Sequence, residues 1–456
     1  MKLGMKAGHD SPLWIAALTA AAALLFAGAV VLCGKMLQTE SVYRKVSSVV
    51  KIYEKVTQDD GSWYTEKVEK PFTRPADVDM LSWDAAIYDL IRQYGYDSDH
   101  VWTGFFAFFP LFPLVWRLTG LGAAGVSVFN WCLFSLGLLL MALLFADRRP
   151  RWALLLPLCA PYAVIFMIPY SEALFFISIA LGMYGLVKER YWIYFVGFLL
   201  GSMTRAAGNI MIVAWLVVDV VDFISSRGGW KQFALDVARH LAPIVLGVFV
   251  VMVVQRLYGA EHWFEYAASQ RYWGKSLSLP DWPLTDWTEM GRSVTWPLML
   301  ILTVPSLVWL VLSLWRGIGK GPMAQLRMLS VLFFVGNVLL AFITQHGCLY
   351  SQARLLTCTP FFVFLLYDMA TAERNRAWQW GMAVAMIVAA VLCIDLFSYP
   401  RTRGCWLVFA SALLVFFGRK MKTWVAVTLL SIAILFNVYW TTYLYNDFLI
   451  GSWCYT

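Results

Sequence analysis

Residues 122–146 read "GAAGVSVFNWCLFSLGLLLMALLFA", a run without a single charged side chain. A helix needs about 20 consecutive apolar residues to cross the hydrocarbon core of a bilayer, so this stretch is long enough to span a membrane. Apolar runs of similar length recur along the chain, at residues 13–33, 236–257, 294–315, 327–344, 355–372, 377–397 and 423–443. The sequence therefore predicts an all-α polytopic membrane protein.

The composition agrees with this prediction. Hydrophobic residues make up 60% of the 456 residues and charged residues only 14%, with a mean hydropathy of +0.65. Soluble domains are closer to half apolar and a quarter charged. The net charge of +8 is explained by short basic loops, which membrane proteins keep on the cytoplasmic side. We therefore expect membrane lipids, and no nucleic acid, as partners.

Shorter or interrupted apolar runs complete the predicted bundle. They cover residues 104–118, 152–168, 171–187, 191–203, 207–224 and 405–417. Together with the longer runs they predict a bundle of about 11–13 transmembrane or re-entrant helices. We expect one membrane domain over residues 1–456, with a retained first transmembrane helix at 13–33, a large first extracytoplasmic loop at 34–103 and a multi-helix bundle at 104–456.

The basic clusters predict the orientation of this bundle. They lie at residues 188–190, 227–231, 316–320, 373–376 and 418–422. If all of them face the cytoplasm, the helices from residue 171 onward alternate correctly. Three full spans between residues 104 and 168 would place residues 170–172 on the wrong side. The proline-broken segment 104–118 is therefore predicted to be re-entrant.

Charged residues at membrane depth are costly and usually serve function, so polar interruptions of the apolar runs near the outer face are candidate site positions. The stretch "LSWDAAIYDLIRQYGY" at 81–96 has apolar residues at helical spacing and predicts a short amphipathic helix lying on the membrane. Asp84 follows Trp83 and lies one turn before Tyr88 on the same face. The Asp84 carboxylate is a candidate general base. The alternative is that Asp84 only caps the helix.

Two further interruptions carry charge between apolar runs. In "IPYSEALFF", Glu172 follows Tyr170 and Ser171, and the alternative is that Ser171 or Tyr170 caps the next helix with Glu172 in its first turn. In "GSMTRAAGN", Arg205 ends a short apolar run and Asn209 follows a helix break. An arginine at such a place is suited to a phosphate. Its alternative is a side chain that snorkels to the surface.

The last two interruptions lie later in the chain. "SQRYWGKSLSLPDWP" contains Gln270, Tyr272 and Trp273, whose aromatic rings can stack on a sugar or form an ordinary interfacial belt. "QHGCLYSQARLLTCTP" contains His346, for which a structural role is the alternative, and Arg354, a second candidate phosphate ligand.

These segments, in this order, resemble the PIG-V family, the second mannosyltransferase of glycosylphosphatidylinositol assembly, and its prokaryotic relatives. The resemblance rests on "SWDAAIYDLIRQYGY" with "AFFPLFPL", then "PYAVIFMIPYSEALF", "TRAAGN", "QRYWG" and "ARLLTCTP", which span roughly residues 80–365. The ordered set is specific, whereas each segment alone is weak. One departure stands out: the family's third motif usually reads Arg-Ser/Ala-Asn-Gly, whereas here Gly208 precedes Asn209.

The resemblance implies a GT-C glycosyltransferase bundle, which takes a sugar from a polyprenyl-phosphate carrier on the outer or lumenal face. It implies that Asp84 is the catalytic acid or base. The other positions that we assign to substrate binding or to the support of the site are Trp83, Tyr88, Pro110, Pro113, Tyr170, Ser171, Glu172, Arg205, Asn209, Gln270, Tyr272, Trp273, His346 and Arg354.

The expected function is therefore a membrane mannosyltransferase that moves the sugar, with inversion, to a lipid, glycan or protein acceptor. We expect neither a cofactor nor a metal, since a phosphate leaving group with arginine partners needs none. The expected location is a prokaryotic plasma membrane, or the endoplasmic reticulum of a eukaryote, with an extracytoplasmic site.

Two alternatives remain open at the level of sequence. A transporter or flippase for a lipid-linked or anionic substrate would share the broken helices and buried arginines. Against it stand the single large outer loop that carries the acidic motif and the lack of a two-fold repeat. A different membrane transferase would need a nucleophile or a metal cluster that the sequence does not show.

Overall fold

The structure is a computed structural model, which describes most of the chain. The described residues are 11–37, 49–57, 63–71, 80–97, 102–226, 229–277, 301, 303, 305–311, 319, 321–344, 351–372, 376–392 and 403–449.

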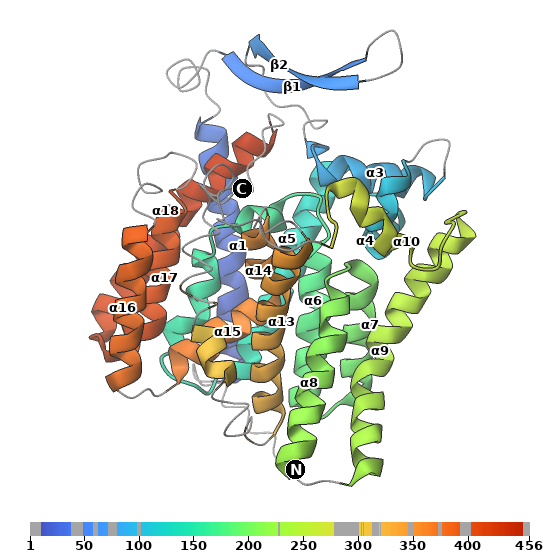
Figure 1. The fold of residues 1–456 in the computed structure, drawn as a ribbon. Helices are drawn as coiled ribbons and strands as arrows, with labels where there is room; N and C mark the ends of the chain where they lie inside the picture. Colours follow the sequence, from blue (N-terminus) through green and yellow to red (C-terminus); the bar gives the residue numbers. More distant parts are fainter. Residues whose placement is uncertain are drawn as a thin grey trace, which may run out of the picture.

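Within these residues, six helices are long and apolar enough to cross a membrane, which suggests an integral multi-pass membrane protein. They are α1 (Pro12–Leu37), α5 (Ala123–Phe145), α8 (Gly208–Ser226), α9 (Trp230–Leu257), α13 (Pro322–Thr344) and α18 (Thr423–Leu449). Shorter apolar helices run beside them (Figure 1), namely α6 (Glu172–Val187), α7 (Tyr191–Thr204), α15 (Pro360–Thr371), α16 (Arg376–Leu392) and α17 (Cys405–Phe417). The predicted run 294–315 lies largely outside the described residues.

The predicted first helix is an integral part of the bundle. Helix α1 packs against α5, where the indole Nε1 of Trp131 donates a 2.9 Å hydrogen bond to the carbonyl of Ala23. Phe26 stacks on the same indole ring at 5.8 Å. The carbonyl of Val30 accepts a hydrogen bond from the hydroxyl of Thr442 in α18.

Helices α6 and α7 approach each other closely because glycines line their contact. A Cβ added to Gly197 would collide with the backbone of Gly182, and one added to Gly201 would collide with Ile179. Gly197 and Gly201 are four residues apart, the small-residue spacing that lets membrane helices pack backbone to backbone. This contact holds the last residues of α7 beside the first residues of α6.

One end of the bundle carries a set of short elements, and we call it the site end. These are α3 (Asp84–Tyr94), η2 (Thr103–Ala107), α4 (Leu111–Thr119), α10 (Glu265–Ala268), η5 (Ser269–Trp273) and α14 (Gln352–Thr357). The amphipathic helix predicted at 81–94 is confirmed as α3. The fold is not entirely helical, because strands β1 (Val49–Thr57) and β2 (Trp63–Pro71) pair as an antiparallel hairpin within the predicted outer loop.

The segment 104–118 forms two short pieces, η2 and α4, neither of which is long enough to span a bilayer. Its irregular backbone is held by side chains from distant parts of the chain. The accepting carbonyls lie in the segment and in the residue just before it. They belong to Thr103 (from Ser269 Oγ, 3.1 Å), Gly104 (from Trp273 Nε1, 2.9 Å), Phe106 (from Gln255 Nε2, 2.7 Å) and Phe108 (from Tyr96 OH, 2.6 Å).

The segment 152–168 is not the α-helix that its apolar composition favours. It consists of two 3₁₀ pieces, η3 (Arg151–Cys159) and η4 (Ala163–Met167), with Pro157 inside the first. It begins just beyond the end of α5, where Arg148 pairs with Asp368 at 3.0 Å. It finishes beside the early part of α5, where Asn130 donates to the carbonyls of Ile168 and Tyr170. The segment therefore runs back along the length of α5 to the site end. We call residues 151–168 the broken crossing, because they traverse the bundle without forming a continuous helix.

The backbone of this broken crossing is buried and hydrogen-bonded by protein. The amide of Asn437 donates to the carbonyls of Leu158 at 2.7 Å and Ala160 at 3.0 Å, and the indole of Trp440 donates to Pro161 at 2.9 Å. Irregular backbone at membrane depth is tolerated only where protein or a cavity covers it. With 151–168 crossing and 104–118 not crossing, Tyr170 and Glu172 lie at the same end as α3.

Candidate functional site

The site begins at the first residue of α3. Trp83 precedes the helix with φ of 56° and ψ of −128°, a conformation that is strained for a residue with a side chain. Asp84 is the first helical residue, and Trp83, not Asp84, occupies the cap position. The interpretation of Asp84 as a helix cap is therefore wrong, and its carboxylate is directed to another partner.

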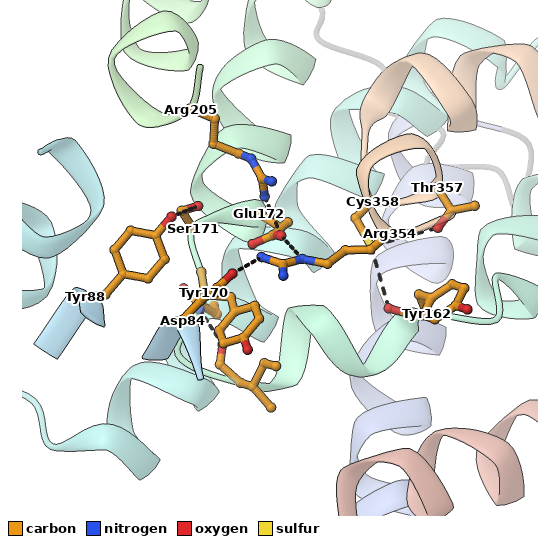
Figure 2. Close-up of polar contacts among 12 residues, drawn as sticks. Asp84, Tyr88, Tyr162, Tyr170, Ser171, Glu172, Arg205, Arg354, Thr357 and Cys358 are labelled. Atoms are coloured by element: carbon orange, nitrogen blue, oxygen red, sulfur yellow. Dashed lines mark hydrogen bonds and ion pairs between the residues drawn. The ribbon is translucent and has the colours of Figure 1, made fainter. Parts of the chain in front are cut away.

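That partner is Arg354, 270 residues later in the chain (Figure 2). Its Nη2 lies 2.7 Å from Asp84 Oδ2, and its Nε lies 2.5 Å from Glu172 Oε1. The same oxygen of Glu172 also forms an ion pair with Nη1 of Arg205. Two carboxylates and two guanidinium groups, from α3, α6, α14 and the end of α7, thus form one network, which we call the ion cluster.

Burial distinguishes the members of the ion cluster. The side chains of Glu172 and Arg354 are only 2% and 6% exposed, whereas those of Arg205 and Asp84 are 15% and 20% exposed. Arg205 does not snorkel to the surface, because it is directed inward to Glu172. Glu172 stands in the first turn of α6, but its role extends beyond the helix start, since it binds both arginines. Asp84 is the more accessible carboxylate of the two.

Local backbone geometry places Arg354 in this network. Ser351, with φ of 58°, precedes the short helix α14 that carries Arg354. Among the described residues, three non-glycine residues have positive φ, and two of them, Trp83 and Ser351, directly precede the helices that carry members of the ion cluster. Such strain tends to concentrate at functional sites.

The ring of Tyr170 packs against the ion cluster. The guanidinium of Arg354 lies over its buried ring at 4.5 Å from the centroid. The Tyr170 backbone is fixed by the side-chain amide of Asn130, which donates a 2.9 Å hydrogen bond to its carbonyl. Asn130 has no exposed surface, so its amide, within the apolar run quoted first, serves to position the polypeptide beneath the site.

Tyr88 joins α3 to the start of α6. Its hydroxyl and that of Ser171 are hydrogen-bonded at 2.7 Å, and its ring packs edge-on against Phe108 at 5.3 Å and Phe112 at 5.0 Å. Burial, together with the negative charges of Glu172 and Asp84, raises the pKa of Tyr88 above its ordinary value. The phenol therefore stays neutral and acts as a structural link rather than a base. Ser171 is the cap residue of α6, but its hydroxyl bonds Tyr88 instead of the helix.

The Tyr88–Ser171 link can be measured by a double-mutant cycle. We expect Tyr88→Phe and Ser171→Ala each to lower the free energy of unfolding by about 1 kcal/mol, the net value of a typical buried hydrogen bond. The double variant is expected to lose little more than either single variant, giving a coupling free energy of about 1 kcal/mol in detergent-solubilised protein. Strictly additive losses would show that the two hydroxyls do not interact.

The aromatic residues Tyr272 and Trp273 lie near the ion cluster but not in it. They form an edge-to-face group with Trp102, at ring distances of 5.2 and 5.8 Å, and each of the three is more than a third exposed. Trp273 also packs edge-on against Phe108 at 5.4 Å, and Phe108 in turn contacts Tyr88. The exposed aromatic group is thus connected through Phe108 to Tyr88, which is hydrogen-bonded to Ser171 beside Glu172.

Asn209 and Gln270 also fall outside the network, and His346 is not described. Asn209 donates to the hydroxyl of Tyr266 at 3.3 Å rather than contacting Arg205. Gln270 donates to the carbonyl of Tyr266 at 3.4 Å, a contact within its own turn. His346 lies outside the described residues.

Sequence reasoning missed one cation of the site, Lys275. It directly follows "QRYWG", where a loop lysine is ordinarily a solvated side chain. In the structure, Lys275 is half-buried, and its ammonium group interacts electrostatically with Arg205, Asp84 and Arg354. Its burial and the nearby positive charge of Arg205 lower its pKa below that of an ordinary lysine.

Comparisons of this chain with protein-family models, with curated proteins and with solved structures found no match. Within the described part of the chain, no group of three or more histidine, cysteine and acidic residues gathers as a metal centre would require. The site instead contains the partly exposed carboxylate of Asp84 together with three cationic side chains. A group of exposed aromatic rings lies nearby.

Proposed function

We propose that this protein is a membrane glycosyltransferase that moves a sugar, with mannose as the expected sugar, from a polyprenyl-phosphate carrier to an acceptor hydroxyl. The observation that carries the proposal is the ion cluster. It places Asp84, the more accessible of its two carboxylates, beside Arg354 at one end of an apolar bundle. A lipid-linked donor requires this arrangement, since its phosphate lies at the membrane surface and its tail lies in the bilayer.

Asp84 is the base in this proposal. From the first turn of α3, its carboxylate accepts the proton of the acceptor hydroxyl while that oxygen attacks the anomeric carbon. A single displacement of this kind inverts the anomeric configuration. The bond from the anomeric carbon to the phosphate oxygen breaks through an oxocarbenium-like state, and its electron pair stays with the phosphate.

The arginines stabilise the negative charge that grows on the leaving phosphate. Glu172 holds the guanidinium groups of Arg205 and Arg354 in place before the substrate arrives, which is what electrostatic preorganisation requires. Removal of one preorganised donor of this kind typically costs about 10²–10³ in rate. Glu172 itself binds both arginines and is a positioning residue.

Two buried oxygen atoms support a substrate that carries hydroxyl groups. Oε2 of Glu172 and Oε1 of Gln352 have no hydrogen-bond partner among the described residues, although both side chains are almost fully buried. Buried acceptors are normally hydrogen-bonded, and leaving them unpaired is costly. Glu172 binds Arg354, and Gln352 stands two residues before Arg354 in α14. Both atoms are acceptors, so the hydroxyl groups of a sugar have the chemistry to satisfy them.

The orientation follows from the charges at the opposite end of the bundle. Arg148 and Arg149 follow α5, Lys188 and Arg190 follow α6, and Lys420 follows α17. Basic residues in short loops favour the cytoplasmic side. We therefore place the site end, with the ion cluster, on the extracytoplasmic side.

The test is sugar transfer by purified protein in liposomes. Radiolabelled polyprenyl-phosphate mannose is supplied together with a lipid extract as the source of acceptors, and empty liposomes serve as the control. We expect label in a product that survives the mild acid that cleaves the donor. A nucleotide-linked sugar should give no transfer.

Two results would contradict the proposal. If no polyprenyl-phosphate sugar is used, the protein is not this kind of transferase. If the intact donor becomes accessible on the opposite side of the liposome without forming a new glycosidic bond, the transporter becomes the better interpretation.

A further inference from the structure

Lys275 is held at the edge of the ion cluster by the backbone around it. Gly274, in the left-handed conformation with φ of 69°, ends η5, and the amide of Lys275 closes the turn on the carbonyl of Gln270 at 3.2 Å. The next amide, of Ser276, donates to the carbonyl of Thr344 at the end of α13. The lysine is thus fixed at both sides, between η5 and α13, and is not part of a free loop end.

The ammonium group of Lys275 makes no ion pair and no hydrogen bond with any described residue. The positive charges of Arg205 and Arg354 nevertheless repel it, and burial lowers the pKa of Lys275. A half-buried cation without a partner is costly, because burial removes the water that would stabilise its charge. Such a cost is removed when an anion binds.

The charges of the site indicate how much negative charge that anion carries. Asp84 and Glu172 contribute two negative charges, and Arg205, Arg354 and Lys275 contribute three positive ones, so that the net charge is +1. A sugar phosphodiester carries one negative charge at neutral pH. The net charge of the site is therefore matched to that of a phosphodiester.

We propose that Lys275, acting with Arg205 and Arg354, binds the phosphate of the lipid carrier. This inference rests on the proposed function, and it identifies the third phosphate ligand and the reason for the excess positive charge. The combined charge of the site and the bound phosphate also stays at zero through the reaction. When Asp84 takes up the acceptor proton, the site changes from +1 to +2, and the phosphate changes from a phosphodiester with one negative charge to a monoester that carries two.

Binding of a short carrier analogue tests this assignment without any sugar transfer. The probe is a ten-carbon isoprenyl phosphate, and its affinity for detergent-solubilised protein is measured by titration calorimetry. Loss of one charge-assisted hydrogen bond to phosphate predicts that Lys275→Met weakens binding by about 10–100-fold. Lys275→Arg keeps the charge and should bind within a few-fold of wild type. The matched control is Lys231→Met, which removes an exposed lysine at the opposite end.

Two further ligands separate the phosphate from the lipid. The corresponding isoprenyl alcohol should bind all variants equally, because it carries no charge. Inorganic phosphate should bind more weakly than the isoprenyl phosphate, since it lacks the tail. The assignment is overturned if Lys275→Met binds the isoprenyl phosphate like wild type, or if it loses the alcohol to the same extent. Equal affinity for inorganic phosphate would overturn the lipid carrier as the source of the anion.

The outcome is distinguishable from a failure of the proposed function. If Lys275 governs isoprenyl-phosphate binding in a protein that transfers no sugar, the phosphate site stands and the transferase falls. If sugar is transferred while Lys275→Met leaves both the binding and the KM for the donor unchanged, the transferase stands and the role of Lys275 falls.

Discussion

Replacement of Glu172 by glutamine is expected to lower the free energy of unfolding by about 3–5 kcal/mol, the range found when one partner of a buried ion pair is removed. The carboxylate of Glu172 binds Arg354 and Arg205 through the same oxygen, and its side chain is 2% exposed. A glutamine of the same shape leaves both guanidinium groups without their shared counter-charge. Equilibrium unfolding of the purified protein in mixed micelles, with increasing denaturing detergent, measures the loss.

Two further variants make this result specific to the ion cluster. Glu261→Gln removes an exposed carboxylate at the same end and should leave the stability within about 0.5 kcal/mol of wild type. Adding Arg205→Met to Glu172→Gln removes one of the orphaned charges and should recover part of the loss. If Glu172→Gln were as stable as the Glu261 variant, the ion cluster would not exist as described.

Asp84→Asn is expected to act on the reaction instead of the fold. Loss of a positioned general base typically costs about 10²–10⁴ in rate, and we expect sugar transfer to fall by that factor. The stability should change far less than in the Glu172 variant, because Arg354 keeps Glu172 as its partner and Asp84 is partly solvated. Initial rates of transfer from polyprenyl-phosphate mannose, per amount of folded protein, measure the effect.

The matched control lies on the same short helix. Asp89 is also acidic and largely buried, but it is bound by Arg92 and Gln93 of α3 itself and does not contact the ion cluster. Asp89→Asn should therefore keep transfer within a few-fold of wild type. Transfer that survives Asp84→Asn would keep the class of enzyme and remove Asp84 as its base.

The sequence was informative where a physical cost stands out against an apolar background. Asp84, Glu172, Arg205 and Arg354 were identified because charge near a membrane needs a reason, and the structure brings these four together. Their pairing could not be predicted, since the partners lie up to 270 residues apart. Local spacing also allows helix caps and a snorkelling arginine as alternatives, and the tertiary contacts decide against a capping Asp84 and a snorkelling Arg205.

The misses have equally specific causes. The run 152–168 has the composition of a helix, but its form is set by Pro157 and by hydrogen bonds from Asn437 and Trp440, which no local pattern reveals. The motif predicts Asn209 as the polar partner beside Arg205, yet the intervening turn directs Asn209 to Tyr266. Lys275 was overlooked because loop lysines are usually solvated.

The broken crossing also constrains the order in which the protein can be assembled. Its carbonyls at Leu158 and Ala160 are satisfied by Asn437, which is synthesised 279 residues after Leu158. Until α18 enters the bilayer, that stretch of backbone lacks the donors that make it tolerable in hydrocarbon. The segment 151–168, which leads to the site end, must therefore stay in water or packed against other helices until α18 is inserted. Only then can it adopt its final structure. The segment that leads to the site end is thus completed late in synthesis, long after Asp84 has left the ribosome.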